Sequence, residues 1–220
     1  MARLLPTPLL VLAMIVAGCS GAASAPSPTA APTPTAAPTL EPTATPVPTP
    51  VDPFADQPYT LTLPAGWRAY NLSDPTAKAA LDTVGSANPS LAYAMQVFES
   101  IPGVRMAVNP LLGNFMLAIS TPSLGMSLDT LSQSFTAQFA AVPGLKTVPK
   151  PEKLTLPGGD AVHWALALSA NKPGGGTVSV DESVYLLANS SQAVILEFVT
   201  PSGGVIPDEP AITNSFAFAS

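Results

Sequence analysis

The sequence predicts an α+β domain, with helices packed on an antiparallel β-sheet, in the part of the chain after residue 53. One long stretch carries apolar residues at helical spacing, whereas several later stretches alternate apolar and polar residues with a period of two. Short turn sequences join the alternating stretches, which favours an antiparallel meander. Residues 54–220 have the ordinary size of one core, about 165 residues, so we expect a single domain.

The first half of this domain is predicted to mix strands and helices. Strands are expected at 59–63 and 68–70 around a turn at 64–67, a helix from Asp74-Pro75 to Val84, a second helix from Asn88-Pro89 to Ile101, and strands at 104–108 and 115–120. Asp or Asn followed by Pro indicates a helix start, because the side chain caps the first amides and Pro fits the first helical position.

The clearest predicted helix begins after Ser127, a good N-cap residue, and carries Asp129 in its first turn. Its apolar stripe consists of Leu128, Leu131, Phe135, Phe139 and Val142, and Pro143-Gly144 ends it. One face of this helix is therefore expected to be buried against the sheet.

The second half of the domain is predicted to be a meander of strands. They are expected at 153–156, 162–168, 178–186 and 194–198, with a hairpin loop at 172–176, a turn at 189–192 and a helical turn at 210–212. The closing segment from Ser215 to Phe218 is expected to dock its apolar side chains on the core.

Residues 1–18 are predicted to be a secretory signal peptide, because one cation precedes an apolar run that is too short to cross a bilayer. The run ends in Val16-Ala17-Gly18-Cys19, which resembles the lipobox of bacterial lipoproteins. The resemblance implies that signal peptidase cuts before Cys19, the only cysteine, after its thiol has received a diacylglycerol. Two or three acyl chains, palmitate among them, make a stable membrane anchor. The alternative is an ordinary secreted protein with an incidental cysteine.

Residues 19–53, behind the lipidated cysteine, are predicted to form a disordered stalk. This segment holds ten of the 27 prolines and almost no large apolar residue, so it cannot form a core. Such a chain is a semi-rigid spacer that, at about 3.1 Å per residue, holds the domain on the order of 100 Å from the membrane. A plain spacer is favoured over an O-glycosylated or partner-binding stalk.

Composition excludes several classes of function. Charged residues make up 10% of the chain, and a net charge of -6 disfavours nucleic acid as a partner. A single cysteine excludes a disulfide framework and a cysteine-based zinc site. There is no Gly-x-Ser-x-Gly motif, and the triple glycine 174–176 is a hairpin turn rather than a phosphate loop. We therefore expect no catalytic residue, cofactor or metal site.

Four short runs resemble the PsbP/Mog1-like fold, in particular its lipid-anchored bacterial branch. They are Leu63 to Trp67, the Pro143-Gly144 helix end, Leu156 to Gly159, and Asn214 to Phe218. The resemblance covers most of residues 57–219 and implies an αβα sandwich around a central antiparallel β-sheet. It also implies a non-enzymatic binding or assembly protein, and it transfers no specific ligand.

The candidate ligand-binding residues are His163, Trp67, Tyr70 and Trp164. His163, the only histidine, is expected on the strand face opposite Val162 and Trp164, and Asp160 on the face opposite His163, which disfavours a joint metal site. The aromatic residues, with Tyr93, fit the lining of an apolar pocket, although aromatic residues in strands are more often core.

Asp181 and Glu182 are expected to point to opposite faces of their strand, so that one lies among valines unless the strand is an edge. We expect an edge strand that the charge guards against aggregation.

The sequence combines a predicted lipid anchor, a stalk and a domain that lacks catalytic motifs. This combination indicates an extracytoplasmic lipoprotein, which is held at a bacterial membrane either on the cell surface or facing the periplasm. We expect it to bind an envelope protein or a small amphiphile without catalysis. Two alternatives stay open: an envelope hydrolase that uses His163 with nearby carboxylates, and a passive structural surface lipoprotein.

Overall fold

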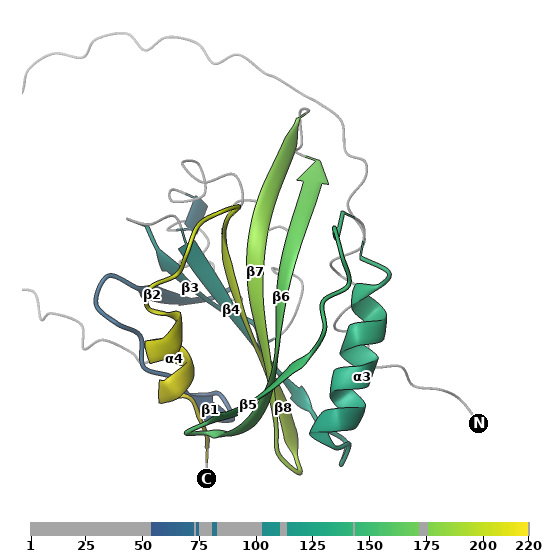
Figure 1. The fold of residues 1–220 in the computed structure, drawn as a ribbon. Helices are drawn as coiled ribbons and strands as arrows, with labels where there is room; N and C mark the ends of the chain where they lie inside the picture. Colours follow the sequence, from purple (N-terminus) through teal and green to yellow (C-terminus); the bar gives the residue numbers. More distant parts are fainter. Residues whose placement is uncertain are drawn as a thin grey trace, which may run out of the picture.

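A computed structural model describes residues 54–72, 74, 81–82, 103–110, 114–142, 144–171 and 176–219 (Figure 1). The predicted signal peptide, Cys19, the stalk, Tyr93 and most of both helices predicted between 75 and 101 lie outside the described residues.

Seven strands of the described chain form one antiparallel sheet, in the order β2-β3-β4-β8-β7-β6-β5. They are β2 (Arg68–Asn71), β3 (Arg105–Asn109), β4 (Asn114–Pro122), β5 (Glu152–Leu156), β6 (Gly159–Asn171), β7 (Thr177–Ala188) and β8 (Gln192–Pro201). The predicted meander of β5 to β8 is confirmed. Its last strand, β8, pairs with β4, which joins the two halves of the domain into a single sheet.

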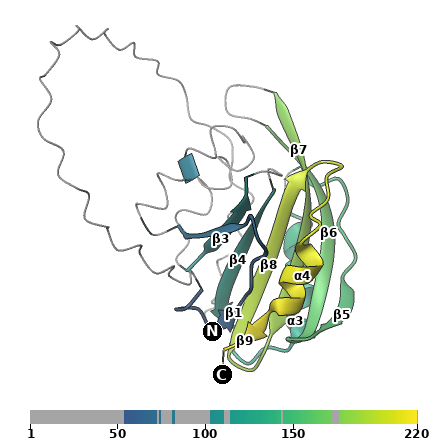
Figure 2. The ribbon, with the colours of Figure 1, turned by 90° about the vertical axis from the view of Figure 1, so that its left-hand side faces the viewer.

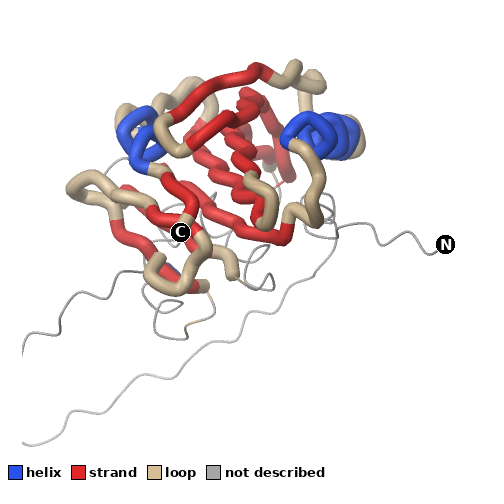
Figure 3. Tube along the Cα trace, turned by 90° about the horizontal axis from the view of Figure 1, so that it is seen from below, coloured by secondary structure: helices blue, strands red, loops and turns tan. Residues whose placement is uncertain are grey.

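Two helices of the described chain lie on opposite faces of this sheet, as the views from the side and from below show (Figure 1, Figure 3). Helix α3 (Leu128–Phe139) begins as predicted, because the Thr130 amide donates to Ser127 Oγ at 3.2 Å. Its buried residues pack on β6 and β7. Helix α4 (Glu209–Ser215) lies on the other face, and Figure 2 looks onto it with α3 behind the sheet.

The alternation of side chains along the strands divides the interior into two cores. The α3-side core includes Leu117, Phe135, Trp164, Val184 and Leu186. The α4-side core includes Tyr59, Trp67, Met116, Phe198 and Phe216. The chain is thus mostly antiparallel sheet with helices packed on it, so the α+β class is confirmed.

A second, two-stranded sheet joins the beginning and the end of the domain. It pairs β1 (Tyr59–Thr60) with β9 (Ala217–Phe218), and the Tyr59 and Phe216 rings stack at 5.9 Å between centroids. The predicted docking of the closing segment is confirmed, since Phe216 is buried. The strand expected at 59–63 is shorter than predicted, because only two of its residues find a pairing partner.

The edge-strand interpretation of Asp181 and Glu182 is wrong. β7 lies between β6 and β8 and pairs with both along most of its length. Glu182 shares a face with Val184 and Leu186 of the α3-side core, so one carboxyl lies in an apolar layer instead of at a sheet edge.

Candidate functional site

The sheet separates the four predicted ligand-binding residues into two pairs on opposite faces. Trp164 is in the α3-side core and Tyr70 packs against it, whereas Trp67 is in the α4-side core. His163 lies on the α4 face, opposite Trp164, as the alternation predicted. The structure therefore does not bring the four side chains into one pocket.

Both tryptophans have structural partners for their indole N–H groups. Trp164 is fully buried, donates to Thr136 Oγ1 at 3.1 Å, and packs against Phe135 and Phe139 of α3. Trp67 donates to Asp208 Oδ2 at 2.8 Å, just before α4. These indoles fasten the two helices to the sheet, and they leave little surface for a ligand.

His163 belongs to a polar cluster that four elements assemble on the α4 face. We call Glu152 of β5, His163 of β6, Ser183 and Tyr185 of β7, and Glu209 of α4 the His163 cluster. The imidazole has Nε2 at 2.8 Å from Ser183 Oγ and Nδ1 at 3.6 Å from a Glu152 oxygen. Its ring lies 4.6 Å from the Tyr185 ring, and 19% of the side chain stays exposed. Among the predicted site residues in the described chain, His163 is the one that lies against several titratable side chains.

Glu209 closes the cluster from the first turn of α4. Its Oε1 accepts from Ser183 Oγ at 2.5 Å and from Tyr185 Oη at 2.7 Å. Burial raises the pKa of the Tyr185 hydroxyl well above its usual range, and the hydrogen bond to Glu209 raises it further. The carboxylate thus ties α4 to β7 through two hydroxyls.

The donors and acceptors of the hydrogen bonds in this cluster differ from those in a catalytic triad. The single hydrogen of Ser183 goes to Glu209, so Ser183 accepts its bond from His163 Nε2–H. In a triad the serine donates to the imidazole nitrogen, which takes the proton during attack. Here that nitrogen already carries a hydrogen, which the hydrogen-bond network assigns. The cluster therefore has the residue types of a serine hydrolase, but its serine does not donate a hydrogen bond to the imidazole.

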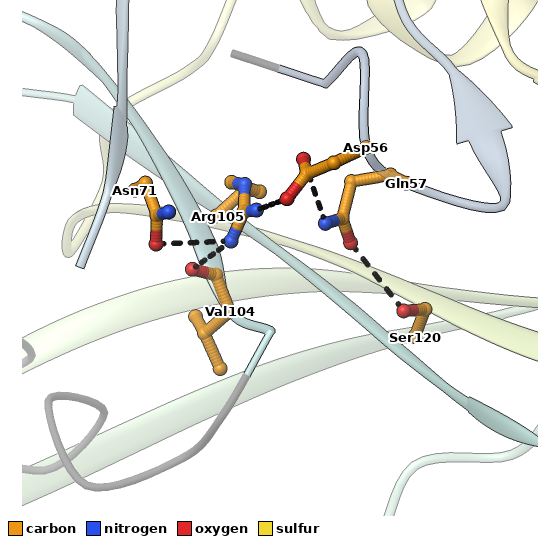
Figure 4. Close-up of polar contacts among 6 residues, drawn as sticks. All are labelled: Asp56, Gln57, Asn71, Val104, Arg105 and Ser120. Atoms are coloured by element: carbon orange, nitrogen blue, oxygen red, sulfur yellow. Dashed lines mark hydrogen bonds and ion pairs between the residues drawn. The ribbon is translucent and has the colours of Figure 1, made fainter. Parts of the chain in front are cut away.

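Sequence reasoning missed a second polar cluster, built around the buried Arg105 of β3 (Figure 4). Its Nη1 donates to Asn71 Oδ1 at 3.1 Å, and its Nη2 pairs with Asp56 Oδ2 at 2.5 Å. Gln57 bonds to both Asp56 and Ser120. The signal in the sequence was an arginine inside an otherwise apolar strand, Val-Arg-Met-Ala-Val.

The Arg105 cluster fixes the entry of the chain into the domain. The hydrogen bond from Arg105, followed by that from Gln57, lowers the pKa of the Asp56 carboxyl. Asp56 is two-thirds exposed, whereas Arg105 is almost fully buried. A buried cation with a surface carboxylate as partner is an anchor for residues 54–57 on β3, rather than an open binding site.

Two further carboxyls lie in the apolar α3-side layer. Glu182 of β7 is opposite Val199 of β8, and Glu197 of β8 is opposite Val184 of β7, so they are diagonal neighbours on one face. Burial raises the pKa of Glu197 to about 7, and burial together with the charge of Glu197 raises the pKa of Glu182 well above its usual range. Each residue keeps a small part of its surface accessible.

An open hollow of about 420 Å³ lies between the start of α3 and the β5–β6 edge. Side chains of both charges line it, and Lys153 Nζ pairs with Asp129 Oδ1 at 2.7 Å across it. Its wall on β5 and β6 is the face opposite His163, so it is separate from the His163 cluster.

Within the described residues, no group of three His, Cys, Asp or Glu side chains is placed to hold a metal ion. No helix in that part of the chain is long and apolar enough to cross a membrane.

No protein-family model and no curated protein sequence matches this chain. Several solved structures resemble it, including the following two. A protein of Bacteroides thetaiotaomicron VPI-5482 has a TM-score of 0.45 at 8% identity, over 74% of this chain and 46% of that one. LpqN, described as involved in cell envelope biogenesis of Mycobacterium tuberculosis, has a TM-score of 0.44 at 14% identity, over 74% of this chain and 83% of that one. The match spans less than half of the Bacteroides protein, and both likenesses are distant.

Proposed function

We propose that this chain is a lipoprotein of a bacterial envelope, anchored through Cys19, whose domain binds an envelope protein or a small amphiphile without catalysing a reaction. Residues 1–18 are removed as the signal peptide, and residues 19–53 hold the domain away from the membrane. The domain, residues 54–220, has a PsbP/Mog1-like fold in this proposal.

The observation that carries the non-catalytic role is the contact of Ser183 Oγ with Glu209 Oε1, from which the direction of the hydrogen bonds is assigned. Ser183 donates to Glu209, so the His163 imidazole is a donor to the serine and does not activate it. An imidazole that stays partly exposed beside an exposed carboxylate suits recognition, because a partner can reach both side chains. We therefore assign His163 and Glu152 to the contact surface.

The four runs that resemble the PsbP/Mog1-like fold all take part in packing contacts of this domain. A Cβ at Gly158 meets the Phe216 carbonyl, and one at Gly144 meets the Ser169 carbonyl. Trp67 is held by Asp208. Each of the four runs thus contributes a residue to a close packing contact within this domain.

Capture from the native membrane tests the binding role. Pull-down of the lipidated protein in mild detergent, followed by mass spectrometry of proteins and lipids, is expected to return one specific partner. The variant His163→Ala is expected to lose that partner, whereas Lys150→Ala, which removes an exposed charge outside the cluster, keeps it. Absence of any specific protein or lipid in the wild-type sample contradicts the proposal.

A hydrolase is the second candidate, because His163 contacts both a carboxylate, Glu152, and a hydroxyl, Ser183, on neighbouring strands. A fluorophosphonate probe distinguishes the two functions, since it labels only an activated serine. The binding role predicts no labelling of Ser183. Labelling that disappears in both Ser183→Ala and His163→Ala supports the hydrolase instead.

A further inference from the structure

The α3-side layer contains an acidic pair that no function described so far uses. Glu182 and Glu197 occupy interior strands, with Leu166 opposite Glu182 on β6 and Leu117 opposite Glu197 on β4. Both leucines belong to the α3-side core. In the described chain neither carboxyl has a hydrogen bond or an ion pair, so the two acids lie among apolar side chains with each other as neighbours.

The other charged groups on this side of the sheet are exposed. Described elements on this side contribute Arg68 of β2, Asp82, Asp129 of α3, Lys146, Lys153 of β5 and Asp160 of β6, all exposed. Asp129 and Lys153 neutralise each other, and Asp160 accepts from Thr155. Asp181 points to the opposite face, where the Gly203 amide donates to it. The strands β3 and β4 bring no charged side chain to this face.

We propose that Glu182 and Glu197 form a proton-dependent latch, which packs the α3-side layer tightly while the pair is protonated and loosens it when both carboxyls ionise. Two like charges on diagonal positions of one sheet face repel each other, and an apolar layer solvates neither. Helix α3 contacts β6 and β7 on this same face, so it is the described element that ionisation displaces.

The sign of the pH dependence follows from the raised pKa values of Glu182 and Glu197. The folded state holds these protons to a higher pH than the unfolded chain does, so the folded state binds more protons above the ordinary range of a glutamate. The contribution of this pair to stability is therefore fully present below that range, and it is lost as the pH rises toward and through neutrality. An ordinary salt-bridged carboxylate has the opposite dependence.

Thermal unfolding of the mature, lipidated chain in detergent tests the latch between pH 5.5 and pH 8. The wild type is expected to have a Tm about 5 °C lower at pH 8, since a few degrees correspond to a modest change in stability for a domain of this size. Glu182→Gln and Glu197→Gln are each expected to reduce the difference, and the double variant to abolish most of it. Asp160→Asn, which removes an exposed carboxyl from the same face, is expected to keep the wild-type difference.

Hydrogen exchange separates a latch from a simple change in stability. At pH 8, the amides of α3 are expected to exchange several times faster in the wild type than in the double variant, and at pH 5.5 equally fast in both. A wild-type Tm that is flat or rises with pH overturns the proposal. So does an unchanged pH dependence in the double variant, or α3 exchange that is equal in the two proteins at pH 8.

Discussion

Arg105 is, within the described part of the chain, the cation with almost all of its surface buried, and its partners decide how the domain begins. Asp56 and Asn71 come from segments before and after the turn at residues 64–67, and both accept hydrogen bonds from the Arg105 guanidinium. An arginine that is withdrawn from water needs such partners, because an uncompensated buried charge is costly. The sequence signalled the unusual residue in the strand, but its partners lie 34 and 49 positions away and carry no local pattern.

Replacement of Asp56 by Asn is expected to destabilise the domain at pH 7 and much less at pH 3. Arg105 lowers the pKa of the Asp56 carboxyl, so its contribution is present above the unfolded pKa and disappears as the pH falls through the folded pKa. Urea unfolding at the two pH values measures this difference. An equal loss of stability at pH 3 and pH 7 contradicts the ion pair as its cause.

Glu209 gives a second prediction, because its Oε1 accepts from two hydroxyls of β7. Glu209→Ala strands the hydroxyls of Ser183 and Tyr185, and we expect a loss of about 1 to 3 kcal/mol in the free energy of unfolding. Glu209→Gln keeps an acceptor oxygen at the same place and is the matched control, with a smaller expected loss. Denaturant unfolding of both variants checks this, and equal losses refute the role of the acceptor.

The elements that the sequence predicted best are those with a long local signal. Helix α3 has its cap and most of its apolar stripe where the spacing placed them, although it ends at Phe139 and Val142 lies beyond it. β6 and β7 continue the period of two over a long hairpin. Pairing between distant segments was not predictable in the same way. No short turn joins β4 to β8 or β1 to β9, because these strands are far apart in the sequence. Their pairing is therefore determined by tertiary packing.

The candidate site was predicted only in part, for a related reason. Alternation correctly separated His163 from Trp164 and Asp160, because faces follow from parity along a strand. Ser183 and Glu209 have no special spacing from His163 in the chain, and they reach it only through strand register and the docking of α4. The position of Glu182 was misjudged because strand order, which parity does not give, decides whether a strand is an edge.

Two glycines with nearly the same φ angle, Gly144 and Gly203, test how closely the segment after α3 approaches β6. Gly144, at φ +82°, lies against the backbone of Ser169 on β6, whereas Gly203, at φ +81°, has open space around it. Gly203→Ala is expected to cost only the strain of a positive φ, about 1 kcal/mol. Gly144→Ala adds a clash with a carbonyl and is expected to cost clearly more. Thermal unfolding of the two variants compares them directly, and equal costs contradict the close approach.

At the scale of the whole molecule, the sheet with its two covering layers is a closed structural unit. Both cores contain many buried apolar side chains of the described chain, and Trp67 and Trp164 are among them. The His163 cluster and the hollow beside α3 are two groups of polar side chains at its surface. A domain of this kind presents surfaces to partners, which agrees with the proposed role of a displayed binding module.

The proposed function depends above all on Cys19, because the membrane anchor gives the domain its place in the envelope. The most direct test is intact-mass analysis of the mature protein, produced from the full sequence in a bacterial host and extracted from its membranes. The proposal predicts a chain that begins at Cys19, has lost residues 1–18 and carries the added mass of two or three acyl chains. It also predicts that Cys19→Ala is neither acylated nor cut at this position. A wild-type protein without acyl mass, or a Cys19→Ala variant that stays fully membrane-bound, contradicts it.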